Sequence, residues 1–434
     1  MTFRHCFLIA SLLGVNTACA AELTDWQLPA RLSYGYGTEA GESVHGYLEL
    51  EPSSTFSLSP RTRLELSARA RLDSVDELEP GKPSLDTYSE FSKPVTLGTA
   101  GTLELRDAYV EFELDNGIAR FGKQQIVWGR LDGLKVLDVL NPQSFREFIL
   151  EDAGHARIGL WSAYVDSTID DWRVEFALIP DATGHQIPDE EAWFQLTAPR
   201  FRYGAKPGQS APQMTTVREQ DWFKETAAGL QVSRFFGSVG VSAMAYSGME
   251  HQPLGRIAIV DSAPVLERYY ERRNLLGLSA DMAIGSVALR AEGAWQPGRT
   301  FNTRSATGLD TDDLDQATLA LGADIFAPLD LFINLQVLFD NIKNAPDTLV
   351  RPDQDRIATA VVRRSFNYET INVELRMNSS LNTGDRLMSA AATYDYRTDT
   401  ELELKFESFR GNERGLFGQF EGRDRLLFSL RQFF

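Results

Sequence analysis

Apolar and polar residues alternate one by one along most of this chain. Clear examples are RLELSARARLD at 63–73, SVALRAEGAW at 286–295, TINVELRMN at 370–378 and ELELKFE at 401–407. A repeat of two over about ten residues is typical of a β-strand whose two faces meet different surroundings. The pattern recurs from about residue 27 to the C-terminus, so the sequence predicts an all-β fold.

The segments between the predicted strands are alternately short and long. Short turns fall at 115–117, 167–170, 284–286, 327–330 and 398–399, and long loops near 73–100, 129–156, 181–221, 249–268, 297–314 and 342–354. Transmembrane β-barrels have this layout, with short periplasmic turns and longer external loops. Counting back from the C-terminus makes 38–42 an external turn, 52–59 a periplasmic turn and 28–37 the first strand. The sequence thus predicts an antiparallel up-and-down barrel of about 18 strands. Sixteen is the alternative, because the first strand, 117–128 and 355–365 are irregular.

The last strand ends the chain on an aromatic residue. In DRLLFSLRQFF, Leu426, Phe428 and Leu430 share a face, and Phe434 is the terminal residue. Such an end resembles bacterial outer-membrane β-barrels, in which the assembly machinery reads the terminal aromatic. The resemblance implies an outer-membrane location, with membrane lipid, lipopolysaccharide and the barrel assembly machinery as partners, and Phe434 as the assembly signal.

The N-terminus is typical of a secretory signal peptide. Residues 1–20 contain Arg4, the apolar run FLIASLLGV and the small-residue site Ala18-Cys19-Ala20, which predicts cleavage after Ala20. The apolar run is too short to cross about 30 Å of hydrocarbon. A lipoprotein signal at Cys19 is disfavoured, because Asn16 stands where an aliphatic residue is usual. Both cysteines would leave with the signal, so the predicted barrel, residues 21–434, has no disulfide.

Net charge and mean hydropathy exclude few classes of protein. The formal charge is −18, which argues against nucleic-acid binding, since phosphates are neutralised by clustered Lys and Arg. The mean hydropathy of −0.25 and the 24% of charged residues suit a soluble protein. They equally suit a membrane barrel, because half of each strand faces a wet lumen.

The long loop at 129–156 carries the strongest local signal. Alternation stops at Trp128-Gly129, Asn141-Pro142 indicates a turn, and SFREFILED at 144–152 predicts one or two helical turns. The loop is too apolar to remain in water, so we expect it to fold into the barrel mouth, pack on the inner wall and narrow the channel. It would then present Arg130, Asp132, Lys135, Asp138, Asn141 and Arg146 to the solute. A cap that only stabilises the barrel is the alternative.

This segment also resembles a known family. VWGRLDGLKVLDVLNPQSFREFILED is similar to the proteobacterial outer-membrane proteins catalogued as domain of unknown function 1302. The matching residues are Gly122, Gln124, Trp128, Gly129, Asp132, Gly133, Asn141 and Pro142. The resemblance implies a barrel related in architecture to the alginate exporter and to porins. It also implies a hydrophobic or polymeric solute, and an inner-membrane transporter of the resistance–nodulation–division type as partner.

The polar faces of the predicted strands carry both signs of charge. The candidates for the lumen face are Arg63, Glu65, Arg69, Arg71, Arg290, Glu292, Glu374 and Arg376. A mixed wall favours cross-strand ion pairs, and a field that sorts polar solutes is the functional alternative.

Other chemistry is weakly indicated. His155 beside Glu151 and Asp152 is the one histidine–carboxylate pairing worth naming for catalysis. The acidic run at 309–315 lacks the central Gly and distal Glu of a calcium loop and predicts a solvated external loop. We therefore expect no metal, no cofactor and no enzymatic activity. The leading hypothesis is an outer-membrane channel. The rivals are a closed barrel with a structural, adhesive or lipid-handling role, and a soluble periplasmic carbohydrate-binding protein.

Overall fold

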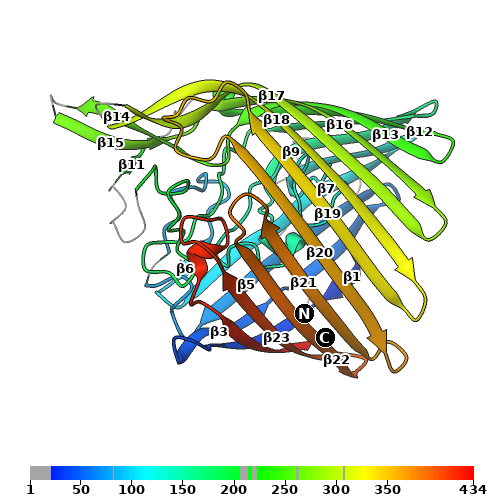
Figure 1. The fold of residues 1–434 in the computed structure, drawn as a ribbon. Coiled ribbons are helices and arrows are strands. Elements are labelled where there is room, and N and C mark those ends of the chain that lie inside the picture. The colour runs from blue at the N-terminus through cyan, green and yellow to red at the C-terminus, as the bar shows by residue number, and fades with distance from the viewer. Residues whose placement is uncertain (1–20, 82, 206–213, 218–221, 261–262, 306–307) are drawn as a thin grey trace.

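The protein is a closed antiparallel barrel of eighteen wall strands (Figure 1). The computed structural model describes residues 21–434 except 82, 206–213, 218–221, 261–262 and 306–307. The predicted barrel and its count of 18 are confirmed, and the alternative of 16 is wrong. The predicted signal peptide, residues 1–20, lies outside the described residues.

The first two wall strands each consist of two segments placed end to end. β1 (Glu22–Gln27) continues into β2 (Ala30–Gly37), and β3 (Glu42–Leu50) continues into β4 (Ser53–Ser59). β2 pairs with β3, and β1 pairs with β4. The predicted periplasmic turn at 52–59 is therefore wrong.

Proline explains both interruptions. Pro29 and Pro52 have no N–H to give to the ladder, yet their carbonyls still accept hydrogen bonds from Glu51 N and Ala68 N at 3.0 Å each. The sheet therefore bends at these positions without ending. The turn that was expected over 52–59 comes after β4, at 60–61.

The other wall strands follow in chain order and pair with their neighbours. They are β5 (Thr62–Asp73), β7 (Gly101–Leu114) with the short β6 (Val95–Leu97) beside it, β8 (Gly117–Gln124), β9 (Leu160–Ile169), β10 (Trp172–Ile179), β12 (Ala227–Phe236), β13 (Val239–Met249), β16 (Arg272–Ile284), β17 (Val287–Ser305), β18 (Gly308–Ala327), β19 (Leu331–Ile342), β20 (Gln354–Phe366), β21 (Ile371–Ser380), β22 (Arg386–Arg397), β23 (Thr400–Arg410) and β24 (Arg425–Gln432). β24 closes the barrel on β2, from Ala30↔Gln432 to Gly37↔Arg425, which leaves the wall without a free edge.

The barrel has one end of short turns and one of long loops. The short-turn end holds 60–61, 115–116, 170–171, 237–238, 285–286, 328–330, 367–370 and 398–399, and the long-loop end holds 74–100, 125–159, 180–226, 250–271, 343–353 and 411–424. N and C lie near each other (Figure 1), and Leu28 N donates to the Phe434 carbonyl at 3.4 Å. The predicted alternation of short and long connections therefore describes most of the barrel.

One predicted long loop, 297–314, is instead a continuation of two strands. β17 and β18 stay paired out to Ser305↔Gly308, with a register shift between Gln296 and Arg299. Gly298, at φ 55°, lies in a β-bulge, which inserts residues without ending a strand. The acidic run at 309–315 accordingly lies in β18, so the expected loop is wrong, although Asp310, Asp312 and Asp313 are exposed as expected.

A small sheet extends from the long-loop end beside this hairpin. It consists of β14 (Leu254–Val260), β15 (Ala263–Tyr269) and β11 (Thr215–Thr216), at the upper left of Figure 1. In the part of the chain that the structure describes, helical structure is limited to α1 (Ala153–Ala156), α2 (Trp222–Glu225) and the 3-10 turn η2 (Gly418–Phe420). None of the helices in the described part of the chain is long and apolar enough to span a membrane.

The two faces of the wall differ as the alternation predicts. In β16, Leu276 and Leu278 are 52% and 64% exposed on the outside, whereas Leu275 is 1% exposed inside. Exposed aromatic side chains are present around the short-turn end: Trp26, Trp172, Phe235, Phe236, Phe326, Tyr368, Tyr396 and Phe434. An apolar outer surface with aromatic residues at its border is typical of barrels in a lipid bilayer.

Candidate functional site

Residues 125–159 connect β8 to β9 through the inside of the barrel, and we call them the lumen loop. Asn141 joins the two ends of this loop. Its side-chain oxygen accepts from Ile126 N at 2.8 Å, and its Nδ2 donates to the Ile158 carbonyl at 2.8 Å. Ile158 N donates to the Pro142 carbonyl at 2.9 Å. The Asn-Pro pair thus fixes the neck of the loop, and Asn141 itself is buried.

The apolar side chains of the lumen loop pack on the inner face of the wall. Trp128, Leu137 and Leu140 are buried in one apolar cluster, where burial stabilises each by about 2 kcal/mol. The wall residues of this cluster are Leu160, Tyr164, Ala177, Ile179, Ala227, Met244, Tyr246, Leu275, Ala294, Ala320 and Leu338. A Cβ at Gly229 would lie 2.7 Å from the Trp128 ring, and one at Gly277 would lie 2.5 Å from Leu137. The predicted inward folding of the loop is confirmed.

The backbone inside the loop does not form the helical turns predicted for 144–152. Phe148 N donates to the Phe145 carbonyl at 2.7 Å, and Leu150 N donates to the Glu147 carbonyl at 3.0 Å, so the segment is a pair of tight turns. Phe148 has φ 54°, which is uncommon for a bulky residue and incompatible with a right-handed helix. The helical turn comes later, in α1.

Glu292 of β17 holds the first part of the lumen loop against the wall. Its carboxylate accepts hydrogen bonds from the backbone N–H groups of Arg130, of Leu131 at 3.1 Å and of Leu137 at 3.2 Å. The side chain is 1% exposed. A buried carboxylate needs donors around it, and here the loop backbone supplies them. Glu292 therefore anchors the loop.

Three of the six predicted constriction residues remain accessible. The side chains of Arg130, Lys135 and Asp132 are 34%, 29% and 78% exposed. Arg130 lies 3.7 Å from Asp281, and Asp132 lies 3.4 Å from Arg290. Burial lowers the pKa of Lys135 to about 8. These three side chains can therefore meet a solute, although each already has a partner of opposite charge within 4 Å.

The other charged candidates of the loop are buried in ion pairs. Asp138 lies 2.6 Å from Arg157. Arg146 is 2% exposed, lies 3.2 Å from Glu147, and stacks over the Tyr47 ring at 4.8 Å. Burial lowers the pKa of a guanidinium, but the neighbouring acidic groups keep the pKa of Arg146 well above its ordinary value. Asp138 and Arg146 therefore hold the loop in place.

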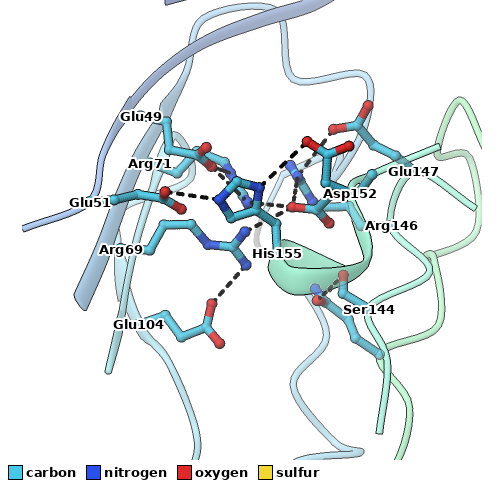
Figure 2. Close-up of polar contacts among 12 residues, drawn as sticks. Glu49, Glu51, Arg69, Arg71, Glu104, Ser144, Arg146, Glu147, Asp152 and His155 are labelled. Atoms are coloured by element: carbon cyan, nitrogen blue, oxygen red, sulfur yellow. Dashed lines mark hydrogen bonds and ion pairs between the residues drawn. The ribbon is translucent and has the colours of Figure 1, made fainter. Parts of the chain in front are cut away.

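Figure 2 shows how wall arginines clamp the far end of the loop. Glu151 lies 2.8 Å from Arg69, 3.6 Å from Arg71 and 3.8 Å from Arg146. The second sides of the two wall arginines are also occupied, by Glu104 at 2.9 Å and by Glu49 at 3.0 Å. Burial alone would raise the pKa of Glu151, but the three guanidinium charges outweigh it and leave the pKa below its ordinary value.

His155 of α1 binds a wall carboxylate. Its Nε2 lies 3.0 Å from Glu51, and its Nδ1 lies 4.0 Å from Asp152 (Figure 2). The hydrogen bond to Glu51 raises the pKa of His155 above its ordinary value. Glu51, which the sequence did not identify as a partner, is thus the carboxylate nearest to His155. Within the described ranges no group of three or more His, Cys, Asp or Glu side chains is arranged to hold a metal ion.

Comparison with known proteins places this loop in a family. A family model described as "Protein of unknown function (DUF1302)" matches residues 85–353, which include the whole lumen loop and most of the wall. The chain belongs to the DUF1302 family. None of the curated proteins compared with it matches.

Two solved structures share the architecture of the DUF1302 chain. OccAB1 of Acinetobacter baumannii is similar over 94% of this chain and 96% of its own, with a TM-score of 0.54 at 8% identity. OpdK of Pseudomonas aeruginosa, solved with vanillate, is similar over 94% of this chain and 98% of its own, with a TM-score of 0.51 at 9% identity. At these identities the likeness shows the fold alone.

The eight predicted lumen residues of the DUF1302 barrel differ in their surroundings. Arg69, Arg71 and Glu292 are buried against the lumen loop, and Arg290 reaches it through Asp132. The remaining four lie in wall contacts: Arg63 lies 2.9 Å from Glu111, Glu65 accepts from Thr55 at 2.7 Å, and Glu374 contacts Arg376 at 3.0 Å. The loop therefore covers only part of the charged wall.

The most buried arginine of the site, Arg425, was missed. It is 1% exposed and lies 2.5 Å from Glu407 and 2.8 Å from Glu147 of the loop. The alternation pattern could have identified it, because Arg425 shares the inward face of the last strand with Leu427 and Ser429. The C-terminal strand thus also holds the lumen loop.

Two cavities are lined by opposite sides of residues 145–151. The first, of about 340 Å³, lies toward β17, β20 and the loops 180–226 and 250–271, and Phe145, Phe148 and Ile149 face it. The second, of about 240 Å³, lies toward β2, β3 and β22–β24, and Arg146, Glu147 and Glu151 face it. We call them the apolar cavity and the polar cavity, after the side chains that line them.

Proposed function

We propose that this DUF1302 protein is an outer-membrane channel whose lumen loop narrows the path of a solute. The closed wall, the apolar outer face and the aromatic border support placement in a bilayer. By the usual arrangement of such barrels, the short turns face the periplasm and the long loops face outward. A barrel of 18 strands is too wide to be filled by wall side chains alone, so the loops decide what passes.

One observation carries the proposal: the lumen loop is bonded to the wall on both sides. It reaches Glu292 of β17 near its start and Arg69 and Arg425 near its end. A loop held at both sides divides the cross-section and forces a solute past its accessible side chains, Arg130, Asp132 and Lys135.

A closed barrel with a structural role is the second candidate. It is favoured by a second apolar cluster, in which loops far apart in sequence pack together at the long-loop end. Phe194, Phe409 and Phe420 are each 0% exposed there. Such packing could seal the mouth, in which case the purified protein would carry no current.

Conductance in planar bilayers tests the proposal. We expect the wild-type protein to give small, discrete currents, and deletion of residues 130–150 to raise the conductance at least threefold because the obstacle is removed. The control is deletion of residues 256–267, which shortens the β14–β15 hairpin outside the wall and should leave the conductance unchanged. Silence from both the wild type and the 130–150 deletion would favour the closed barrel.

The proposed partners are the barrel assembly machinery, which would read Phe434, outer-membrane lipid with lipopolysaccharide, and an inner-membrane transporter. Phe434 is 66% exposed, which suits recognition by another protein. The transporter rests on the family resemblance alone, as does a polymeric solute. A channel requires no catalytic group, cofactor or resident metal, and the proposal includes none.

A further inference from the structure

We propose that the apolar cavity is a binding site for an uncharged apolar molecule at least the size of an aromatic double ring. The inference rests on the proposed channel function for its biological meaning, since it names the substrate class that the channel would retain.

The volume and the lining of the cavity support this ligand class. At about 340 Å³ the cavity lies within the range of sites that hold small organic molecules. Aromatic rings reach it from four separate segments, through Phe145, Phe201, Phe301 and Phe417. Ile149 is 40% exposed although it belongs to the lumen loop, and the surface that it exposes lines this cavity. Apolar surface left uncovered inside a barrel gains free energy when a ligand removes it from water.

The charged groups at the cavity neutralise one another. Arg200 lies 2.5 Å from Asp355, and Arg299 lies 2.7 Å from Glu250. Arg351 lies 2.7 Å from Asp340 and also contacts Asp355 at 2.6 Å. Each guanidinium thus has a carboxylate partner already.

An ionic ligand would gain little at this site. Because the guanidinium groups are paired, an anion would lose its hydration without meeting an unpaired positive charge. His185 also lines the cavity, and burial lowers its pKa to about 3, so it is uncharged at pH 7. The same reasoning applies to a cation, since the carboxylates are occupied as well.

The charged side chains of residues 145–151 favour retention of a ligand in the apolar cavity. A molecule leaving toward the periplasm would pass from Phe145 and Ile149 to the polar cavity, lined by Arg146, Glu147 and Glu151. Moving an apolar molecule from an apolar lining to a charged, hydrated lining is unfavourable. An apolar molecule is therefore held more favourably in the apolar cavity than in the polar cavity.

A charge series on one ring system tests the ligand class. The probes are indole, indole-3-acetate and tryptamine, which are neutral, negative and positive at pH 7. Binding is measured by equilibrium dialysis with the full-length mature barrel in lipid nanodiscs, and uptake by empty nanodiscs is subtracted. We expect saturable binding of indole, and binding at least tenfold weaker for each charged relative.

Two matched substitutions locate the site. Ile149→Trp fills the cavity and should weaken indole binding at least tenfold. Ile169→Trp places the same side chain at an exposed position, 59% exposed at the end of β9, and should leave binding unchanged. If Ile149→Trp does not fold, Ile149→Asp is the second test of the site. It should weaken indole binding and strengthen tryptamine binding, each at least fivefold.

Three results would overturn the inference: no saturable indole binding above empty nanodiscs, equal binding by the Ile149 and Ile169 variants, or tighter binding of indole-3-acetate than of indole. Equilibrium binding requires no permeation. Bound indole without conductance would therefore contradict the channel and keep the site, whereas conductance without bound indole would contradict the site and keep the channel.

Discussion

At the scale of single residues, the charges inside this barrel act through their partners. Glu292 binds loop backbone, Arg425 joins two glutamates, and Arg69 lies between Glu104 and Glu151. Separating a buried charge from its partner costs free energy. These side chains therefore hold the loop in place and contribute little to attracting solutes. Alternation identified Arg69 and Glu292 as inward-facing, but it could not identify their partners.

Glu292→Ala should release the start of the lumen loop. It leaves the backbone N–H groups of Arg130, Leu131 and Leu137 without their acceptor. The bond to Leu137 is buried and the other two are only partly buried, and one unsatisfied buried donor costs about 1–3 kcal/mol. We expect the free energy of unfolding in guanidine to fall by about 2 kcal/mol and the bilayer conductance to rise. The control, Glu374→Ala, removes a wall glutamate whose partners are Arg363 and Arg376, and it should change both quantities little. Equal effects of the two substitutions would contradict the anchoring role.

At the scale of elements, the lumen loop is a structured part of the barrel. Asn141 closes its neck, Trp128 and Leu137 dock on glycines of the wall, and charged pairs hold residues 146–155. The apolar composition predicted that this loop would turn inward. It could not predict the turns at 144–152, because the positive φ of Phe148 depends on packing against other loops.

The contact between α1 and the wall should depend on pH. The hydrogen bond to Glu51 raises the pKa of His155, so protonation favours the folded state. Its contribution is complete below the unfolded pKa of about 6.5 and is lost as pH rises through the higher folded pKa. We expect the stabilising effect of His155, measured as the unfolding midpoint of the wild type minus that of His155→Gln, to decrease from pH 6 to pH 8.5.

The control for this pH effect is His185→Gln. Burial lowers the pKa of His185 to about 3, below the unfolded value of about 6.5, so its contribution has the opposite sign, and the unfolding midpoint of the wild type minus that of His185→Gln should increase over the same range. A difference between the wild type and His155→Gln that is constant or increases with pH would rule out a stabilising His155–Glu51 contact.

Two errors at the element scale have a common physical cause. Pro297-Gly298 and Pro52 are turn signals in sequence, yet the wall strands continue past both. At the first the chain absorbs extra residues in a bulge, and at the second the proline carbonyl keeps its hydrogen bond. A closed sheet satisfies almost all of its other backbone groups, so a single proline bends a strand without ending it.

At the scale of the whole molecule, alternation and the parity of the connections were sufficient to predict the closed barrel. The cavities could not be predicted, because their walls come from segments far apart in sequence. Leu134, Phe201 and Phe417 line the same apolar cavity, and no local pattern links them. Arg425 and Glu147 are likewise 278 residues apart in sequence, so no local pattern predicts their ion pair.

The central claim is that a solute passes the lumen loop on its way through the barrel. After residue 20 the chain contains no cysteine, so one can be introduced at Asp132, whose side chain is 78% exposed on the loop. A cationic methanethiosulfonate reagent added to the open Asp132→Cys channel should reduce its conductance by at least half. The same reagent on Asp347→Cys, an exposed position of the 343–353 loop, should label without effect. Unchanged current at position 132, or equal block at both positions, would contradict the account.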